Sequence, residues 1–113
     1  MVGHKRNSDR QGAYLAAGLA GFALGVAPNQ ILETERGSLE VSRARQVAMY
    51  LAHVGFGMSL ARVAEAFGRD RSTVAYACHA IEDRREDERF DAWMETLEQG
   101  VIAVAPLQDV LVA

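Results

Sequence analysis

The sequence has little of several residue types, and each shortage excludes a class of protein. One cysteine among 113 residues rules out an internal disulfide and suits a reducing compartment such as the cytoplasm. Two prolines and ten glycines are too few to indicate a disordered chain. Aromatic residues amount to only 7%, but half of the residues are apolar, which is enough for the modest core of one domain.

The sequence also lacks motifs for metal binding, catalysis and nucleotide binding. No pair of Cys or His has the spacing of metal ligands, the three histidines form no catalytic set, and no phosphate-binding G-x-x-x-x-G-K-[ST] run occurs. Cys78 lies on an apolar stripe and is interpreted as a small core residue. We therefore expect no enzyme, no metal and no other cofactor.

Charge is distributed unevenly along the chain. The formal net charge is −3, yet residues 36–81 carry six arginines against three acidic residues, and residues 82–98 carry three arginines against eight. A local basic patch can bind phosphate, while an acidic remainder weakens sequence-independent binding to nucleic acid. The pattern favours a specific, weak DNA reader over a DNA-packaging protein.

Two short helices joined by a tight turn are predicted over residues 59–81. Apolar residues recur at i, i+3, i+4 and i+7 on both sides of a break, and Gly68 can end the first helix without a Cβ penalty. Ser59 and Asp70 can cap the first amides of the two helices. Such a pair is a helix-turn-helix, whose second helix can enter the DNA major groove, although an ordinary helical hairpin has the same pattern. The two stripes are Leu60, Val63, Ala64 and Phe67, then Val74, Ala77, Cys78 and Ile81.

The start of the second helix carries side chains that suit DNA. Arg71 can reach a guanine edge or a phosphate, and Ser72 and Thr73 can hydrogen-bond either. Asp70 can accept from a cytosine or adenine amino group, or it serves only as a helix cap. Phosphate contacts are expected from Arg43, Arg45, the amides after Ser59 and His79, the last being equally compatible with an idle surface histidine.

The N-terminal quarter of the chain allows competing interpretations. Residues 1–8 form a polar lead-in, and the apolar segment 13–27 imitates a secretory signal peptide, is too short to span a membrane comfortably, and fits a buried first helix. We favour the buried helix, because the residues downstream indicate a cytoplasmic protein. Its cap would be Ser8 or Asp9, and its core side chains Tyr14, Leu15, Leu19 and Phe22.

A turn at Pro28, one helical turn at 30–32 and an exposed loop over 33–40 are expected next. A helix follows over 41–54, where Val47, Leu51 and Val54 form the apolar stripe, Ser42 is the available cap, and Gly55 and Gly57 end the segment.

Beyond the motif, the second helix is expected to run past Ile81 into the solvated stretch EDRREDER. Helical spacing of Phe90, Trp93, Met94 and Leu97 predicts a further helix that packs on the body, with Trp93 as a core anchor. The apolar tail 99–113 either covers the first helix or makes an intermolecular contact.

Three motifs resemble the C-terminal DNA-binding domain of the bacterial replication initiator DnaA. They are A-R-Q-x-A-M-x-L at 44–51, S-L-x-x-V-x-x-A-F-G at 59–68 and R-D-x-S-T-V-x-x-A-C at 69–78. The resemblance covers roughly residues 9–90 and implies an all-α domain that reads a short duplex site. It implies major-groove contacts from Asp70, Arg71, Ser72 and Thr73, and phosphate contacts from Arg45, Gln46, Leu60 and Ala61.

The sequence departs from the family pattern in four ways. The ATPase and helicase-loading parts are absent, so initiator activity is not implied. The turn has one glycine where the family usually has two, and Arg71 replaces the usual histidine. The family's basic loop before Ser42, which sends an arginine into the minor groove, reads ETERGSLE here, with Gly37 near the arginine position. Weaker binding and an altered preferred sequence are therefore expected.

The sequence thus predicts an all-α helix-turn-helix bundle with a lead-in at 1–8, one domain at 9–98 and a tail at 99–113. The predicted function is sequence-specific binding of double-stranded DNA by a cytoplasmic, nucleoid-associated regulator of transcription or replication, without a membrane segment. The alternative is a protein-interaction module that has lost DNA binding and acts through its acidic helix or its apolar tail. Residues 99–113, the tail, are also expected to hold a homodimer or a protein partner. The candidate DNA-binding residues are Arg43, Arg45, Gln46, Leu60, Ala61, Arg69, Asp70, Arg71, Ser72, Thr73, Tyr76 and His79.

Overall fold

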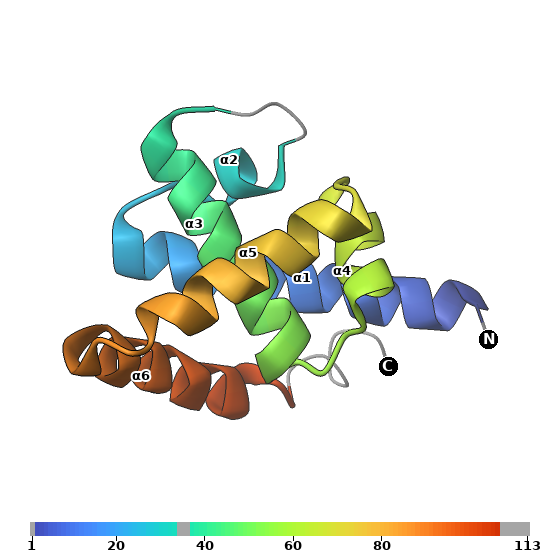
Figure 1. The fold of residues 1–113 in the computed structure, drawn as a ribbon. Helices are drawn as coiled ribbons and strands as arrows, with labels where there is room; N and C mark the ends of the chain where they lie inside the picture. The colour runs from blue at the N-terminus through green and yellow to red at the C-terminus, as the bar shows by residue number, and fades with distance from the viewer. Residues whose placement is uncertain (1, 34–36, 107–113) are drawn as a thin grey trace.

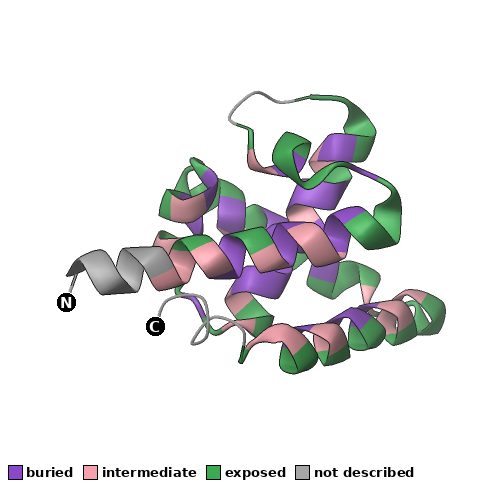
Figure 2. Ribbon diagram, turned by 180° about the vertical axis from the view of Figure 1, so that it is seen from behind, coloured by how far each residue is buried: buried purple, intermediate pink, exposed green. Residues whose placement is uncertain are grey.

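The longest helix, α1 (Val2–Leu24), runs across the back of the molecule and packs against α2, α3, α4 and α6 (Figures 1 and 2). The computed structural model describes residues 2–33 and 37–106, with side chains from Ser8 onward, and every regular element in this part of the chain is helical. The predicted all-α class is confirmed. None of the described helices is long and apolar enough to cross a membrane. The remaining elements are α2 (Pro28–Leu32), α3 (Leu39–Tyr50), the π-helix η1 (Leu51–Gly55), α4 (Leu60–Phe67), α5 (Arg71–Arg84) and α6 (Glu88–Val104).

Small side chains form the buried face of α1. Tyr14 and Phe22 are 57% and 93% exposed, so the prediction that they cover the core is wrong, while Leu19 packs at the edge of the core. Alanines have the same helical spacing on the opposite face, and their size lets the neighbouring helices approach closely. The buried alanines are Ala13, Ala16, Ala17 and Ala20.

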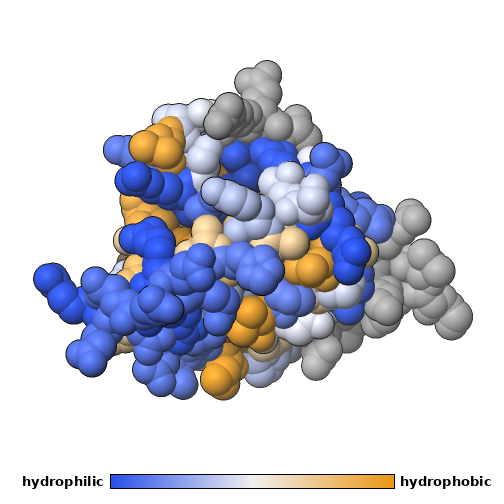
Figure 3. All heavy atoms as spheres, viewed as in Figure 1, coloured by the Kyte–Doolittle hydropathy of each residue, from blue (hydrophilic) through white to orange (hydrophobic). Residues whose placement is uncertain are grey.

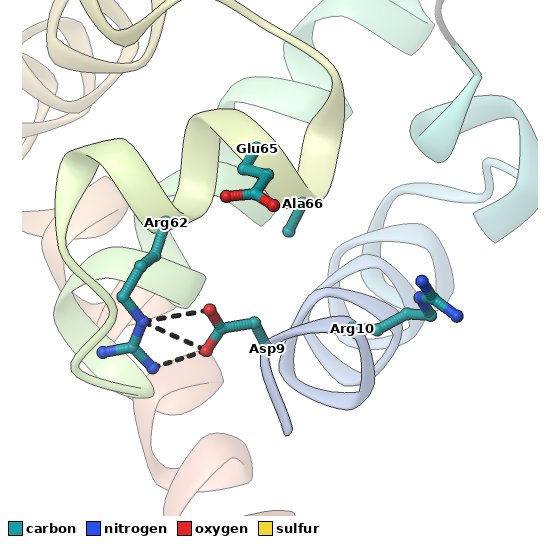
Figure 4. A pocket seen from close by; sticks show the side chains of 5 residues that line it. All are labelled: Asp9, Arg10, Arg62, Glu65 and Ala66. Carbon is teal, nitrogen blue, oxygen red and sulfur yellow. Dashed lines mark hydrogen bonds and ion pairs between the residues drawn. The ribbon is translucent and has the colours of Figure 1, made fainter. Parts of the chain in front are cut away.

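Asp9 ties α1 to the first helix of the motif instead of capping α1. The helix already begins at Val2, so the predicted caps Ser8 and Asp9 are wrong. The Nε of Arg62 lies 3.1 and 3.0 Å from the two carboxylate oxygens of Asp9, and its Nη2 pairs with the same group (Figure 4). This ion pair joins two segments far apart in the sequence.

Replacing Arg62 with Gln is expected to lower the free energy of unfolding by about 1 kcal/mol, because the lost pair is bidentate but partly exposed. Arg10→Gln is the matched control, since Arg10 lines the same pocket but points away from Asp9 (Figure 4). Urea denaturation of both variants measures the difference. Equal losses in both variants would show that net charge, not the pair, is responsible.

The helix predicted over 41–54 begins earlier and changes character before its end. Ser38, and not the predicted Ser42, is the cap, because its Oγ accepts from the Val41 amide at 3.2 Å. From Leu51 the chain widens into η1, which rotates later side chains away from the α-helical register. Val54 is therefore 48% exposed, and the prediction that it belongs to the apolar stripe is wrong.

Helices α4 and α5 confirm the predicted helix-turn-helix. Both apolar stripes are buried, with Leu60 at the edge of the core. Gly68 ends α4 in the left-handed conformation, at φ 64° and ψ 39°, which a side chain would strain. The Ser59 Oγ accepts from the Arg62 amide at 3.2 Å, as predicted for the cap of α4. The predicted apolar stripes, the glycine that ends α4 and the serine cap of α4 are thus confirmed.

The charged stretch after Ile81 is divided between two helices. Helix α5 extends only to Arg84, and Asp87 caps α6 by accepting from the amides of Arg89 and Phe90 at 2.8 and 3.1 Å. The predicted helix around Trp93 is confirmed, although Trp93 is only half-buried and its ring lies 5.6 Å from that of Phe90. Helix α6 continues into the predicted tail, where Val101 is buried; residues 107–113 lie outside the described part.

A polar network joins the C-terminal ends of α3 and α5 to α6. The buried Tyr50 hydroxyl donates to Glu82 and accepts from Arg85 Nη1 at 3.2 Å. Arg85 also donates from Nε to Asp91 at 2.6 Å and pairs with Glu98 at 3.0 Å. Burial alone would lower the pKa of Arg85, but the bonds to Asp91, Tyr50 and Glu98 outweigh it and raise that pKa.

Candidate nucleic-acid interface

The first turn of α5 is exposed on the front of the molecule (Figure 1). Arg71, Ser72 and Thr73 are all exposed, which a contact with an external ligand requires. Asp70 occupies the N-cap position with extended backbone, but its side chain makes no capping hydrogen bond, so the expected capping role is wrong. The exposed carboxylate of Asp70 remains available to an external donor.

The same face continues along α5. Tyr76 is 71% exposed and His79 is exposed, and they follow Ser72 at i+4 and i+7. Towards the C-terminal end of α5 the surface becomes acidic, and the most hydrophilic part of this view lies over that end and the start of α6 (Figure 3). The exposed face of α5 is thus neutral to basic at its start and acidic at its end.

A groove of about 300 Å³ separates α3 from the start of α5. It brings together five of the candidate residues from two distant segments. Two arginines and several hydrogen-bonding groups share its walls, a combination suited to a phosphate oxygen. The groove is lined by Ser42, Arg45, Gln46, Met49, Arg69, Thr73, Tyr76 and Ala77.

Arg45 lies inside the protein, where it holds the end of α2. Its side chain is 4% exposed, with Nε donating to the Ile31 carbonyl at 2.8 Å and Nη2 to the Gln30 carbonyl at 3.0 Å. Burial, followed by the positive charge of Arg69, lowers the pKa of Arg45, while Glu33 opposes the shift. The phosphate contact expected of Arg45 therefore competes with these internal bonds.

Arg69 makes a similar set of bonds from the turn before α5. Its Nη1 donates to the carbonyls of Phe67 and Gly68, each at 3.3 Å, and its Nη2 donates to the carbonyl of Glu33 at 3.0 Å. Sequence reasoning missed the internal roles of Arg45 and Arg69, because nothing local indicates that both side chains reach carbonyls at the end of α2.

The remaining candidates lie around the edges of this face. Arg43 is exposed beside a second groove, with Arg84 and Trp93, and does not line the groove that holds Arg69. Ala61 is exposed and Leu60 half-buried at the start of α4, and Leu60 shares a third groove with His79. Within the described residues no three His, Cys, Asp or Glu side chains gather where they could hold a metal ion.

Comparison with known proteins now decides the family. Residues 23–81 match the family model described as "Bacterial dnaA protein helix-turn-helix", which is more than half of the chain. The chain belongs to this DnaA helix-turn-helix family. The match includes α3, α4 and nearly all of α5, and therefore the groove and the exposed first turn.

Individual DnaA relatives agree with this assignment. The chromosomal replication initiator protein DnaA of Thermodesulfovibrio yellowstonii is 37% identical over 70 residues, which cover 60% of this chain and 16% of the relative. DnaA 2 of Chlamydia trachomatis is 52% identical over 46 residues, 41% of this chain and 10% of the relative. The chain spans less than a fifth of the length of these DnaA proteins.

A solved structure extends the likeness beyond the matched segment. The crystal structure of a DNA replication initiation factor superposes with a TM-score of 0.77 and 27% sequence identity. The superposition covers 88% of this chain and 31% of the other. The resemblance to the DnaA helix-turn-helix domain predicted from the three motifs is thus confirmed.

Proposed function

We propose that this DnaA-type domain binds double-stranded DNA in a sequence-specific manner, with the first turn of α5 in the major groove. The observation that carries the proposal is the exposed start of α5, where Arg71, Ser72 and Thr73 are free of the core and the Asp70 carboxylate is not used as a cap. The start of a recognition helix is the part that meets base edges in helix-turn-helix proteins.

Each side chain of this turn has a role that follows from its chemistry. Arg71 donates two parallel hydrogen bonds to a guanine, and the Thr73 methyl meets a thymine methyl. Asp70 accepts from the amino group of a cytosine or adenine, and Ser72 bonds a base or a phosphate. Tyr76 and His79 lie further along the same face and extend the contact.

Phosphate contacts come from both sides of α5. On one side Gln46 lines the groove beside Thr73, where the charges of Arg45 and Arg69 supply a positive potential. On the other side the amides of Leu60 and Ala61 begin α4, which favours an anion. Arg43 reaches a more distant phosphate. The acidic end of α5 keeps non-specific binding weak.

We further propose that such binding serves regulation of transcription or replication in the cytoplasm, at the nucleoid. A titration of isotope-labelled protein with random-sequence duplexes at low salt, followed by nuclear magnetic resonance, tests the binding face. Amide shifts are expected in residues 70–76, at the start of α4 and around Gln46. The absence of any shift would contradict DNA binding.

The same titration separates the alternative function. A homodimer or a protein partner held by residues 99–113 remains a proposal, supported by Ile102, which is 66% exposed within the described part of that segment. If duplex DNA leaves α5 unchanged while raising the protein concentration shifts Ile102 and its neighbours, the protein-interaction function is favoured.

A further inference from the structure

Two arginines, Arg45 of α3 and Arg69 of the turn before α5, meet at the end of α2. The Glu33 carbonyl accepts from Arg69 Nη2 at 3.0 Å and from Arg45 Nη2 at 3.4 Å. The last carbonyls of a helix have no partner within the helix, and α2 is only five residues long. The two guanidinium groups therefore satisfy the end of α2 and join it to α3 and to the turn before α5.

The connection between α2 and the turn matters because Arg69 lies in the turn that leads directly into α5. Arg69 lies between Gly68, in the left-handed conformation, and Asp70, the N-cap of α5. Its Nη1 holds two carbonyls of the turn while its Nη2 holds Glu33, 36 residues earlier in the chain. One planar side chain thus joins the turn to α2, and its bond to the Glu33 carbonyl opposes movement of the start of α5 away from α2.

We propose that Arg69 is a positioning residue, assisted by Arg45, that sets the orientation of the first turn of α5 and does not itself bind phosphate. The inference rests on the proposed function, because orientation matters where Arg71 must align with a base. Paired hydrogen bonds to a base require the donor to be held within a fraction of an ångström. Arg45, to which the family resemblance assigned a phosphate contact, and Arg69, a candidate DNA-binding residue, thus acquire a different role in this chain.

Arg69→Lys separates positioning from phosphate binding. Lysine keeps the charge but lacks the planar fork that reaches several carbonyls at once. The ratio of affinity for a preferred duplex to affinity for random duplexes is expected to fall about tenfold, as for the loss of charged hydrogen bonds. Arg69→Ala is expected to lower the ratio equally, and random-duplex binding by the lysine variant stays at the wild-type level.

Three results would overturn the inference. The first is wild-type specificity in Arg69→Lys together with an Arg69→Ala variant that binds all duplexes more weakly to the same degree. In that case the slope of log affinity against log salt concentration would fall by about 0.9, the signature of one lost phosphate contact. The second is a lowered melting temperature with the affinity ratio unchanged, which would show a purely structural role. The third is unchanged amide chemical shifts of α2 in the DNA-free Arg69→Lys protein.

The chemical shifts of α2 do not depend on DNA binding, so they keep the two proposals apart. If wild-type protein prefers no sequence but Arg69→Lys still changes the amide chemical shifts of α2, the proposed function fails while the connection between α2 and the turn is supported. If wild-type protein is specific and Arg69→Lys is equally specific, only the inference fails. Arg89→Lys, at an exposed arginine in the first turn of α6, is the matched control and is expected to change neither readout.

Discussion

Arg71→Ala is expected to lower affinity for the preferred duplex by about 10- to 100-fold, the effect of losing one paired contact to a base of about 1–3 kcal/mol. Arg71 is exposed in the first turn of α5, where removing its side chain leaves no cavity in the core. Binding to random duplexes is expected to change far less. Fluorescence anisotropy with one selected and one scrambled duplex measures both affinities.

Arg89→Ala is the control for this experiment, because it removes one exposed arginine outside the face of α5. It is expected to leave both affinities close to wild type. A second variant, Thr73→Ala, is expected to relax preference at a different base pair from Arg71→Ala. If Arg71→Ala lowers the affinities for the selected and the scrambled duplex equally, Arg71 contacts a phosphate and does not read a base.

Alkaline titration of Tyr50 is expected to remove about 3 kcal/mol of folding free energy between roughly pH 10 and 12. Burial, followed by the hydrogen bond to Glu82, raises the pKa of Tyr50 from 10.0 to about 12. The unfolded chain thus loses this proton at lower pH than the folded protein. The stabilisation is complete below the unfolded pKa and disappears as the pH rises through the folded pKa.

Urea denaturation at several pH values across this range measures the effect, with Tyr50→Phe as the reference. The phenylalanine variant loses the bonds to Glu82 and Arg85 and is less stable at neutral pH. Its stability is nevertheless expected to lack the part of the alkaline decline that belongs to Tyr50. Parallel declines in the two proteins would mean that the hydroxyl of Tyr50 titrates normally and that the network is loose.

The helix-turn-helix could be predicted from sequence because the information is local. Apolar spacing, a glycine with positive φ at Gly68 and a serine cap at Ser59 lie within one short stretch. The family resemblance rested on the same stretch, and the family match over residues 23–81 includes it.

Other features could not be predicted, because they depend on partners distant in the chain. Helix α1 has two apolar faces. The alanine face is buried, and the face with Tyr14 and Phe22 is exposed, because the neighbouring helices pack too closely for large side chains. The widening at η1 exposed Val54 without any proline or glycine to mark its start. The internal role of Arg45 could not be predicted, because the carbonyls of α2 that it binds lie 14 and 15 residues earlier in the sequence.

Selection from a random-sequence duplex library, with purified protein at low and then at physiological salt, tests whether the first turn of α5 reads DNA sequence. We expect enrichment of one short asymmetric motif, which is retained when the salt is raised and is lost or altered with Arg71→Ala. Retention of DNA at low salt alone, with no enriched motif, would contradict a sequence-reading role for α5.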